Sequence, residues 1–321
     1  MAVYTPVSDA DLANFLESYD VGHAISFKGI AEGVENTNYF LQTDRDRYIL
    51  TLFEKRVPKQ DLPFFMALMN HVVEAGLPAA APVSNSAGQT LGQLNGRPAA
   101  LIAFLDGTSK TAPEKAACAA CGTMLARLHQ ATADFDQTRD NAFSLPGWQR
   151  LAQDCKAEAN RCADDLNTFI RDELAFLQQH WPGPDALPRA VVHTDLFPDN
   201  VLFRDNRISG VIDFYFACTD FYAFDLAVTL NAWCFDETHV FQVDHARALL
   251  MAYQEHRPLD AAEKKALPVF LRGSALRFVL TRLYDWINQD PIALVSVKDP
   301  LEYRDKLRFH QQNDFWNLID E

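Results

Sequence analysis

The sequence predicts an α+β protein with two lobes: a small antiparallel-sheet lobe with an added helix, then a larger, mainly helical lobe. Residues 25–53 contain three short strand-like runs, which are typical of an antiparallel meander. Residues 106–109 (Asp-Gly-Thr-Ser) then interrupt the pattern after an apolar run, and helical periodicity dominates from residue 113 onward. We therefore expect an N-terminal lobe over residues 1–105 and a C-terminal lobe over residues 106–321; the polar motifs described below indicate nucleotide binding for the first and catalysis with substrate binding for the second.

The composition is that of a folded protein with a substantial hydrophobic core. Of the 321 residues, 48% are hydrophobic and 22% are charged, and the formal net charge is −14. This acidity disfavours nucleic acid and anionic membranes as partners, whereas a nucleotide site needs only local positive charge and a metal. No apolar run reaches the length of a membrane span, and the N-terminus does not resemble a signal peptide. We expect a cytoplasmic protein; its oligomeric state does not follow from the sequence.

The predicted N-terminal elements begin with a helix and continue with the sheet. Ser8 and Asp11 have the spacing of a capping box, and a helical stripe of apolar residues follows them. A second helix over residues 62–73 should end at Gly76, and short strands should fill residues 82–104. The three strand-like runs of the meander cover residues 25–30, 39–41 and 47–53.

The turn between the first two strands contains glycines that leave its backbone open, so it could close over phosphate groups. An ordinary hairpin loop has the same composition and is the alternative. Other candidates for nucleotide contact lie beside this turn or at the end of the sheet. The candidate nucleotide-binding residues are Lys28, Gly29, Gly33, Asn38 and Phe104.

Helical patterns fill most of the C-terminal lobe. Pro268 and Gly273 should divide the longest of them into two helices. Cys118 and Cys121 form a CxxC pair inside the first, but no second ligand pair accompanies them, so we interpret them as core residues in a reducing compartment. The predicted helices cover residues 113–133, 147–162, 164–181, 223–234, 239–256, 261–289 and 299–313.

The most informative stretch is a polar loop between two apolar runs, residues 191–203. Phosphoryl transfer requires a group that orients the attacking hydroxyl and oxygen ligands for a metal. Asp195 suits the role of catalytic base. Asn200, five residues later, and Asp213, at the end of a second strand-like run, suit Mg²⁺ binding if a hairpin over residues 201–212 returns the chain. Each alone would more often be a turn residue, but the combination favours phosphoryl transfer.

These residues also carry a family resemblance. Residues 193–200 (His-Thr-Asp-Leu-Phe-Pro-Asp-Asn) with residues 212–214 (Ile-Asp-Phe) resemble the motifs of the aminoglycoside phosphotransferase and choline kinase group, which has a protein-kinase-like fold. Residues 125–129 (Leu-Ala-Arg-Leu-His) and 36–39 (Asn-Thr-Asn-Tyr) are similar to two further motifs of that group. The resemblance implies a two-lobed protein-kinase-like fold with ATP and Mg²⁺ as cofactors.

Within that group, the chain resembles the bacterial homoserine kinases at residues 48–54, 76–83, 213–218 and 276–285. The resemblance implies ATP-dependent phosphorylation of the side-chain hydroxyl of L-homoserine, a step toward threonine. Composition and spacing alone leave other acceptors open, namely choline, an aminoglycoside or methylthioribose. A nucleotide-binding regulatory module that transfers no phosphate is the alternative from a different class.

Two features depart from most kinases of this fold. The strand position that usually carries a phosphate-binding lysine is Thr51 here, and residues 60–73 contain no glutamate that could pair with one. Lys28 and Lys55 are the candidate replacements. Phe197 stands where His or Lys is common, two residues after the catalytic aspartate, so no charge contact to the γ-phosphate is expected from that position.

A homoserine site needs a cation for the α-carboxylate, and arginine binds carboxylates bidentately. Arg277 and Arg282 lie five residues apart in an apolar helical pattern, so they point in different directions. Either could face the acceptor while the other forms an internal ion pair, and Arg277 is the stronger candidate. His193 and Tyr215 complete the candidate substrate-binding residues. By resemblance, Asp225 is expected to brace the catalytic loop.

Overall fold

The structure is a computed structural model that describes residues 4–30, 36–54, 57–289 and 297–320. Two residues predicted to contact the nucleotide, Gly33 and Lys55, lie outside the described residues. None of the helices in the described ranges is long and apolar enough to cross a membrane.

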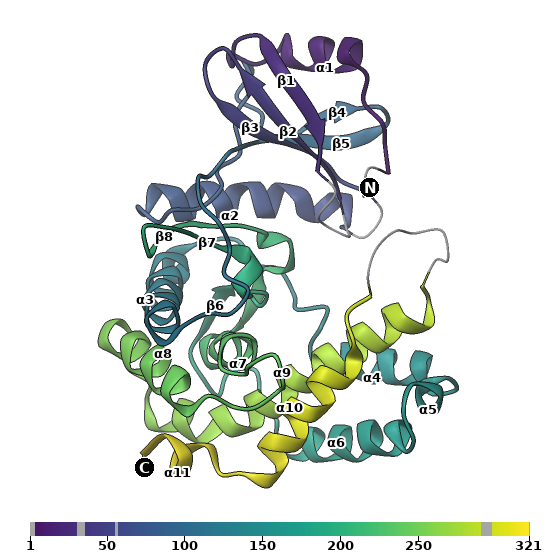
Figure 1. The fold of residues 1–321 in the computed structure, drawn as a ribbon, viewed down its shortest axis with the longest axis vertical. Helices are drawn as coiled ribbons and strands as arrows, with labels where there is room; N and C mark the ends of the chain where they lie inside the picture. The colour runs from purple at the N-terminus through teal and green to yellow at the C-terminus, as the bar shows by residue number, and fades with distance from the viewer. Residues whose placement is uncertain (1–3, 31–35, 55–56, 290–296, 321) are drawn as a thin grey trace. The chain divides into compact units, whose positions relative to one another are not determined.

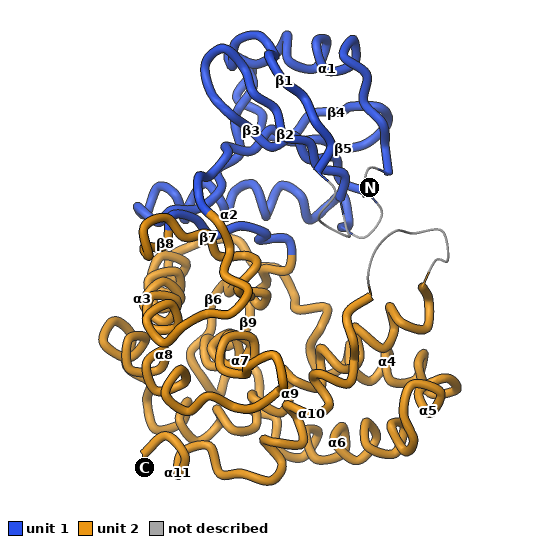
Figure 2. The backbone as a smooth tube through the Cα atoms, in the orientation of Figure 1, with its two compact units in different colours: residues 1–107, 209–215 blue, residues 108–208, 216–321 orange. Residues whose placement is uncertain are grey.

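The chain forms two compact units, which Figure 2 shows in different colours. Residues 209–215, which the predicted division at residue 105 assigns to the C-terminal lobe, group with the first unit. Unit 1 contains residues 1–107 and 209–215, and unit 2 contains residues 108–208 and 216–321.

Unit 1 is built on a five-stranded antiparallel sheet with the strand order β1-β2-β3-β5-β4 (Figure 1). The first three strands form the predicted meander, in which Asn38 pairs with Thr51. β5 is buried through its centre, as its continuous apolar sequence predicts. The strands are β1 (Ala24–Gly29), β2 (Thr37–Thr43), β3 (Arg47–Leu52), β4 (Gly92–Leu94) and β5 (Arg97–Ala103).

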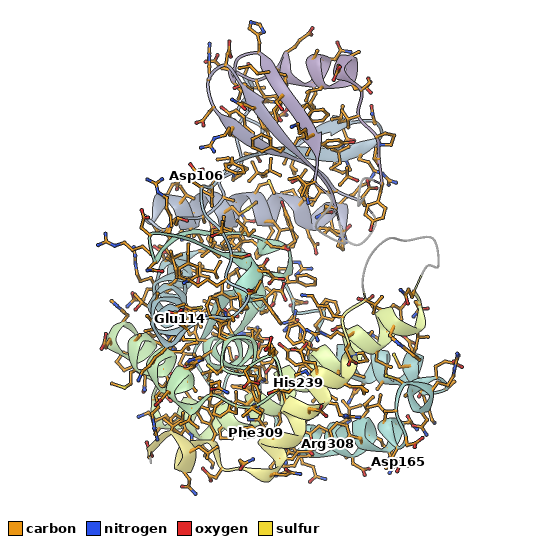
Figure 3. All side chains as sticks on the ribbon, viewed as in Figure 1. Asp106, Glu114, Asp165, His239, Arg308 and Phe309 are labelled. Carbon is orange, nitrogen blue, oxygen red and sulfur yellow. The ribbon has the colours of Figure 1, made fainter. Side chains whose placement is uncertain are left out.

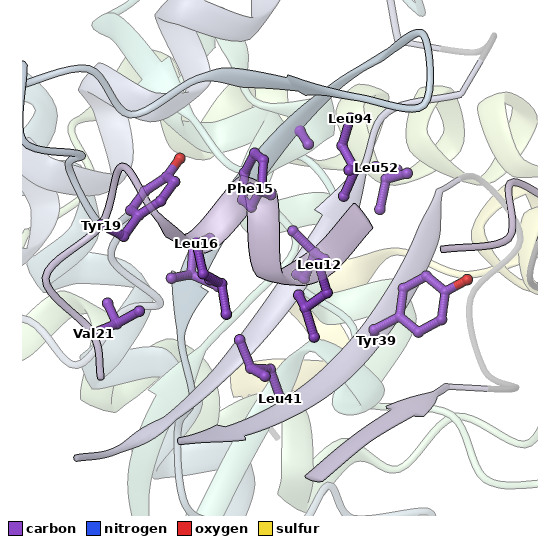
Figure 4. Packing of buried hydrophobic residues seen from close by; sticks show 12 residues of the cluster. Leu12, Phe15, Leu16, Tyr19, Val21, Tyr39, Leu41, Leu52 and Leu94 are labelled. Carbon is purple, nitrogen blue, oxygen red and sulfur yellow. The ribbon is translucent and has the colours of Figure 1, made fainter. Parts of the chain in front are cut away.

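Helix α1 (Asp9–Leu16) begins at the predicted capping box. The Ser8 hydroxyl accepts from the Asp11 N–H at 3.2 Å, and the Asp11 carboxylate accepts from the Ser8 N–H at 3.0 Å. Helix α2 (Leu62–Glu74) ends before Gly76, which has a left-handed backbone. Figure 4 shows the buried apolar core that α1 and the sheet share, which includes Leu12, Phe15, Leu16, Leu41, Leu52 and Leu94.

Unit 2 is mainly helical, and its helices pack around the buried helix α7. The polar loop follows β6, which pairs with β9 in a short two-stranded sheet. The region predicted as one helix over residues 147–162 is two helices, and the short helix α11 was not predicted. The elements after residue 108 are α3 (Lys115–Ala131), α4 (Leu145–Cys155), α5 (Ala159–Cys162), α6 (Leu166–His180), β6 (Arg189–Val192), β7 (Val201–Arg204), β8 (Arg207–Val211, whose last three residues belong to unit 1), β9 (Cys218–Phe221), α7 (Tyr222–Trp233), α8 (Val243–His256), α9 (Ala261–Ile287), α10 (Pro300–Gln312) and α11 (Phe315–Asp320).

Helix α9 runs unbroken through Pro268 and Gly273, so the expected division of this helix is wrong. A proline at 268 has no N–H to donate to the backbone oxygen of Lys264, one turn earlier. That oxygen instead accepts a hydrogen bond from Trp316 Nε1 at 2.8 Å. At Gly273, a Cβ atom would lie 2.4 Å from the Trp181 ring, so this glycine permits close packing rather than ending the helix.

An aromatic cluster joins α10 to the segment after α7. The ring of Phe309, labelled in Figure 3, lies 5.5 Å from the ring of Phe235 and 4.8 Å from that of Phe241, measured between centroids. The neighbouring His310 is buried, and its Nε2 lies 2.7 Å from Asn231 Oδ1. Because Asn231 belongs to α7, this hydrogen bond ties α10 to the central helix of unit 2.

Candidate active site

The polar loop follows β6 and ends in a 3-10 turn at Pro198–Asn200. Asp195 lies in it half-buried, with hydrogen bonds on both sides. The Asn200 side-chain amide donates to the Asp195 backbone oxygen at 2.8 Å and to its carboxylate at 3.1 Å. The Asp195 N–H donates to His193 Nδ1 at 3.2 Å. The structure therefore brings three of the predicted site residues into one hydrogen-bonded group.

Thr194, the residue before Asp195, has a left-handed backbone with φ of 58°. Such a conformation is unfavourable for a β-branched residue and costs about 1–3 kcal/mol. Three hydrogen bonds hold it: its N–H donates to Asp225 Oδ1 at 2.7 Å, its hydroxyl donates to the Phe216 oxygen at 3.0 Å, and its own oxygen accepts from Arg277 Nη1 at 2.5 Å. The surroundings thus fix the backbone that presents Asp195.

Asp225 of α7 braces this loop, as the resemblance implied. Its fully buried carboxylate accepts the N–H groups of His193 at 2.9 Å and Thr194 at 2.7 Å. It also lies 3.0 Å from Nε2 of the buried His129. Burial alone would raise the pKa of Asp225, but the hydrogen bonds from His129 and the His193 backbone outweigh it, so the pKa lies below its usual value. The carboxylate is therefore charged, and it accepts hydrogen bonds from these three groups.

The support of Asp225 continues into two residues that sequence reasoning missed. His129 Nδ1 lies 2.8 Å from the Tyr253 hydroxyl, which accepts from Arg257 Nη1 at 3.0 Å. Arg257 also donates to Glu263 at 2.8 Å, and Glu263 is the capping-box residue of α9. Burial lowers the pKa of His129, so the ring is neutral. Tyr253 lies in α8, and Arg257 follows the last residue of that helix, four positions later. This helical spacing is the only sequence signal that could have suggested the pair.

The surroundings of Asp195 adjust its acidity. Burial raises the pKa of its carboxyl, while the nearby charges of Arg277 and His193 act in the opposite direction. A carboxylate with a raised pKa accepts a proton more readily than an exposed one. This suits a group that receives the hydroxyl proton in the transition state.

The two candidate arginines of α9 have different environments. Arg277 is 2% exposed; its guanidinium lies among the rings of Phe143, Phe216 and Phe278, at 4.7–5.7 Å from their centroids. Arg282 instead donates to the Glu302 carboxylate at 2.6 Å. One arginine is thus in an internal ion pair, and the other faces the catalytic loop through Thr194.

The remaining candidates belong to unit 1. Lys28 and Gly29 are exposed in β1, and the Asn38 side chain accepts from the Thr51 hydroxyl at 2.8 Å. Phe104 follows β5, and its ring lies 5.3 Å from that of Phe40.

Two other predicted site residues follow β8 in unit 1. Asp213 has a left-handed backbone with φ of 63°. The ring of Tyr215 packs edge-on against Phe53 and Phe65, with centroids 5.2 and 5.7 Å away. The half-buried Tyr215 thus packs against two buried rings of unit 1.

Comparison with known families places these features in context. Residues 26–259 match the phosphotransferase enzyme family. The chain belongs to this family. The match includes the meander, the loop with Asp195 and Asn200, and the bracing residue Asp225.

Relatives that align with this chain over almost their whole length are about half identical to it. A homoserine kinase of Beijerinckia indica is 53% identical over 311 residues, which are 97% of this chain and 96% of that protein. A homoserine kinase of Methylobacterium radiotolerans is 54% identical over 312 residues and 97% of each chain.

Solved structures of more distant proteins share the fold. The amicoumacin kinase hAmiN, in complex with AMP-PNP, Ca²⁺ and Ami, has a TM-score of 0.75 at 15% identity over 97% of each chain. A microcompartment-associated aminopropanol kinase has a TM-score of 0.68 at 18% identity, over 95% of this chain and 97% of that one. At such identities the similarity establishes the α+β, protein-kinase-like fold.

For a member of the phosphotransferase enzyme family, Thr51 is the notable departure in unit 1. Its side chain is 3% exposed, and its hydroxyl is bound to Asn38. The position is therefore a compact buried one, where an unpaired cationic side chain would be unfavourable.

Proposed function

We propose that this protein transfers the γ-phosphoryl group of ATP to the side-chain hydroxyl of L-homoserine and forms O-phospho-L-homoserine, on the route to threonine. The observation that carries the proposal is the identity of 53–54% with homoserine kinases over 97% of the chain. The loop geometry supports the proposal, because the hydrogen bonds described above hold Asp195 in a fixed position, which a catalytic base requires.

Asp195 is the residue that addresses the acceptor hydroxyl. Its carboxylate orients the hydroxyl for in-line attack and accepts the proton as the new P–O bond forms, while the bond from γ-phosphorus to the ADP oxygen breaks. Asn200 and His193 fix the carboxylate and backbone of Asp195 through the hydrogen bonds described above. His193, predicted as a substrate-binding residue, would thus also position Asp195 for the acceptor.

Asn200 and Asp213 are the proposed ligands of Mg²⁺. The Asn200 amide nitrogen is bonded to Asp195, which leaves the amide oxygen as the group suited to a hard cation. Asp213 supplies a carboxylate from unit 1, and its pairing with Asn200 rests on the sequence motif. The bound metal would neutralise charge on the β- and γ-phosphates.

Four described residues of unit 1 are proposed to hold ATP. Lys28 and Gly29 lie at the end of β1, next to the glycine turn, where an exposed cation and an open backbone suit phosphate groups. Asn38 lies on β2 and Phe104 directly follows β5, and the half-buried Phe104 ring is suited to contact with an adenine base.

Arg277 is the proposed anchor for the α-carboxylate of homoserine. It is a buried cation next to the catalytic loop, and within the described part of the chain no carboxylate forms a salt bridge with it. The Glu302 ion pair of Arg282 and the ring packing of Tyr215 favour structural roles for these two candidates. An amino-acid acceptor therefore fits the site better than a polycationic one.

The decisive experiment is a Mg-ATP assay with the purified protein across L-homoserine, L-serine, L-threonine, amino alcohols, choline and aminoglycosides. We expect ADP release with L-homoserine and a phosphomonoester product detected by phosphorus NMR. An Asp195→Asn preparation, purified in parallel, controls for contaminating kinases. Turnover of another acceptor with none of homoserine would refute the substrate and leave the fold assignment intact.

A further inference from the structure

Among the described residues, a few buried polar atoms lack a hydrogen-bond partner, and two of them lie next to the catalytic loop. Arg277 Nε and the Tyr303 hydroxyl are on different helices, α9 and α10, and these side chains are 2% and 0% exposed. Leaving such a donor unpaired in the interior is unfavourable, so each needs an explanation. The atoms without a partner among the described residues are Tyr19 Oη, Trp148 Nε1, Ser209 Oγ, Arg277 Nε and Tyr303 Oη.

Arg277 and Tyr303 share the same aromatic neighbours. The Phe278 ring lies 4.7 Å from the Arg277 guanidinium carbon and 4.8 Å from the Tyr303 ring. Phe197 follows Asp195 by two residues. Its ring lies 5.0 Å from the Phe278 ring and 6.3 Å from the Tyr303 ring, measured between centroids. These four residues, which we call the Arg277–Tyr303 cluster, thus place both unpaired groups beside the residue that addresses the acceptor.

The electrostatics of the cluster connect it to Asp195. The charges that act on the Tyr303 hydroxyl are, in decreasing order, those of Arg282, Glu302, Asp195 and Arg277, and Arg277 is the strongest charge acting on Asp195. Burial raises the pKa of Tyr303, so its hydroxyl stays protonated and can donate a hydrogen bond. Phe197 and Asp195 are only half-buried, so the side of the cluster at the catalytic loop is the more accessible one.

A cation and a neutral donor that are both unsatisfied match one kind of ligand group. A carboxylate has two oxygens and accepts hydrogen bonds from both a guanidinium and a phenol. An ammonium group would be repelled by Arg277, and an apolar group would leave both donors unpaired. The cluster therefore suits the carboxylate of an acceptor whose hydroxyl reaches Asp195.

We propose that Tyr303 is a further substrate-binding residue, whose hydroxyl donates a hydrogen bond to the α-carboxylate that Arg277 holds. This inference rests on the proposed function and deepens it. Tyr303 would make the enzyme select amino acids over amino alcohols that have the same hydroxyl and ammonium groups. The selectivity arises because an acceptor without a carboxylate leaves the buried donors unsatisfied.

The test compares L-homoserine with 3-aminopropan-1-ol, its counterpart without the carboxylate, in the wild type and in Tyr303→Phe. Phenylalanine keeps the ring packing, and a thermal melt confirms that the variant is folded. We expect the KM for homoserine to rise about tenfold or more, the effect of a lost hydrogen bond to a charged group. The constant for 3-aminopropan-1-ol, as KM or as Ki against homoserine, should change by less than about twofold.

Tyr19→Phe is the matched control, because Tyr19 also has a buried, unpaired hydroxyl but lies in the hydrophobic core of unit 1. This variant should keep both constants. An unchanged homoserine KM in Tyr303→Phe, or an equal rise for both acceptors, would overturn the inference while homoserine turnover persists. A wild type that does not phosphorylate homoserine would instead refute the proposed function.

Discussion

The side-chain amide of Asn200 donates to the carboxylate of Asp195 at 3.1 Å and to the backbone oxygen of the same residue at 2.8 Å. This relationship couples the proposed metal ligand to the proposed base. The orientation of one depends on the other, so substitutions at either position should affect both metal use and proton transfer.

Asp195→Asn should reduce kcat at least about 10²-fold, because the amide cannot accept the hydroxyl proton. The shape of the side chain is retained, so the melting temperature should stay close to that of the wild type. Steady-state kinetics with L-homoserine measure the effect. Asp205→Asn is the matched control, since Asp205 is 93% exposed at the β7–β8 turn and asparagine tolerates its left-handed backbone. Activity equal to wild type in Asp195→Asn would exclude this residue as the base.

Asn200→Asp should move the acid limb of the pH–rate profile to higher pH. Burial already raises the pKa of Asp195, and a second carboxylate in place of the donating amide would raise it further. The unprotonated base then forms only at higher pH. We expect a shift of about one pH unit or more in the kcat/KM profile at saturating Mg-ATP. An acid limb at its wild-type position would show that Asp195 does not control it.

Arg277→Lys should raise the KM for L-homoserine about tenfold while the KM for ATP stays nearly constant. Lysine keeps the positive charge but cannot offer two donors in the fixed geometry of a guanidinium. Arg282→Lys is the control in the same helix, because Arg282 is paired with Glu302 and lysine can keep that ion pair. If the Arg282 variant, and not the Arg277 variant, loses affinity for homoserine, the two assignments must be exchanged.

His310→Gln should reduce the loss of stability in acid. Burial lowers the pKa of His310 to about 3, below the unfolded value of about 6.5. The unfolded chain therefore takes up a proton first as the pH falls, and folding loses about 1.4 kcal/mol per pH unit between those two values. Glutamine can still donate to Asn231 Oδ1 but does not titrate.

Urea denaturation between pH 7 and pH 4 measures the effect as the slope of the free energy of unfolding against pH. That slope should be about 1.4 kcal/mol per unit smaller in His310→Gln than in the wild type. The exposed His256, changed to glutamine, is the control and should leave the slope in place. An identical slope in all three proteins would mean that His310 has the same pKa in the native state as in the unfolded chain.

Local patterns in the sequence were enough to predict much of the fold. The capping box at Ser8, the three-strand meander and the buried β5 depend on neighbours in the chain or on simple periodicity. The division of α9 failed because the missing hydrogen bond at Pro268 is replaced by Trp316, 48 residues further on. No local pattern reports such a contact.

The candidate site likewise contains residues that local sequence patterns predicted and residues that they did not. The spacing of Asp195 and Asn200 in one short loop made their association predictable. Tyr253, Arg257 and Tyr303 escaped notice because each is an ordinary helical residue whose role depends on which distant element packs against it. Arg277 and Arg282 could be named as a pair, but only their contacts separate a residue beside the loop from one in an ion pair.

The buried Asp225 carboxylate should hinder local opening of the loop that it braces. The loop amides of His193 and Thr194 both donate to it, and the carboxylate is anchored in the centre of unit 2. In amide hydrogen exchange, these two N–H groups should therefore be protected like those of a core helix, although they lie in a loop. The segment that presents Asp195 would open only when unit 2 itself unfolds.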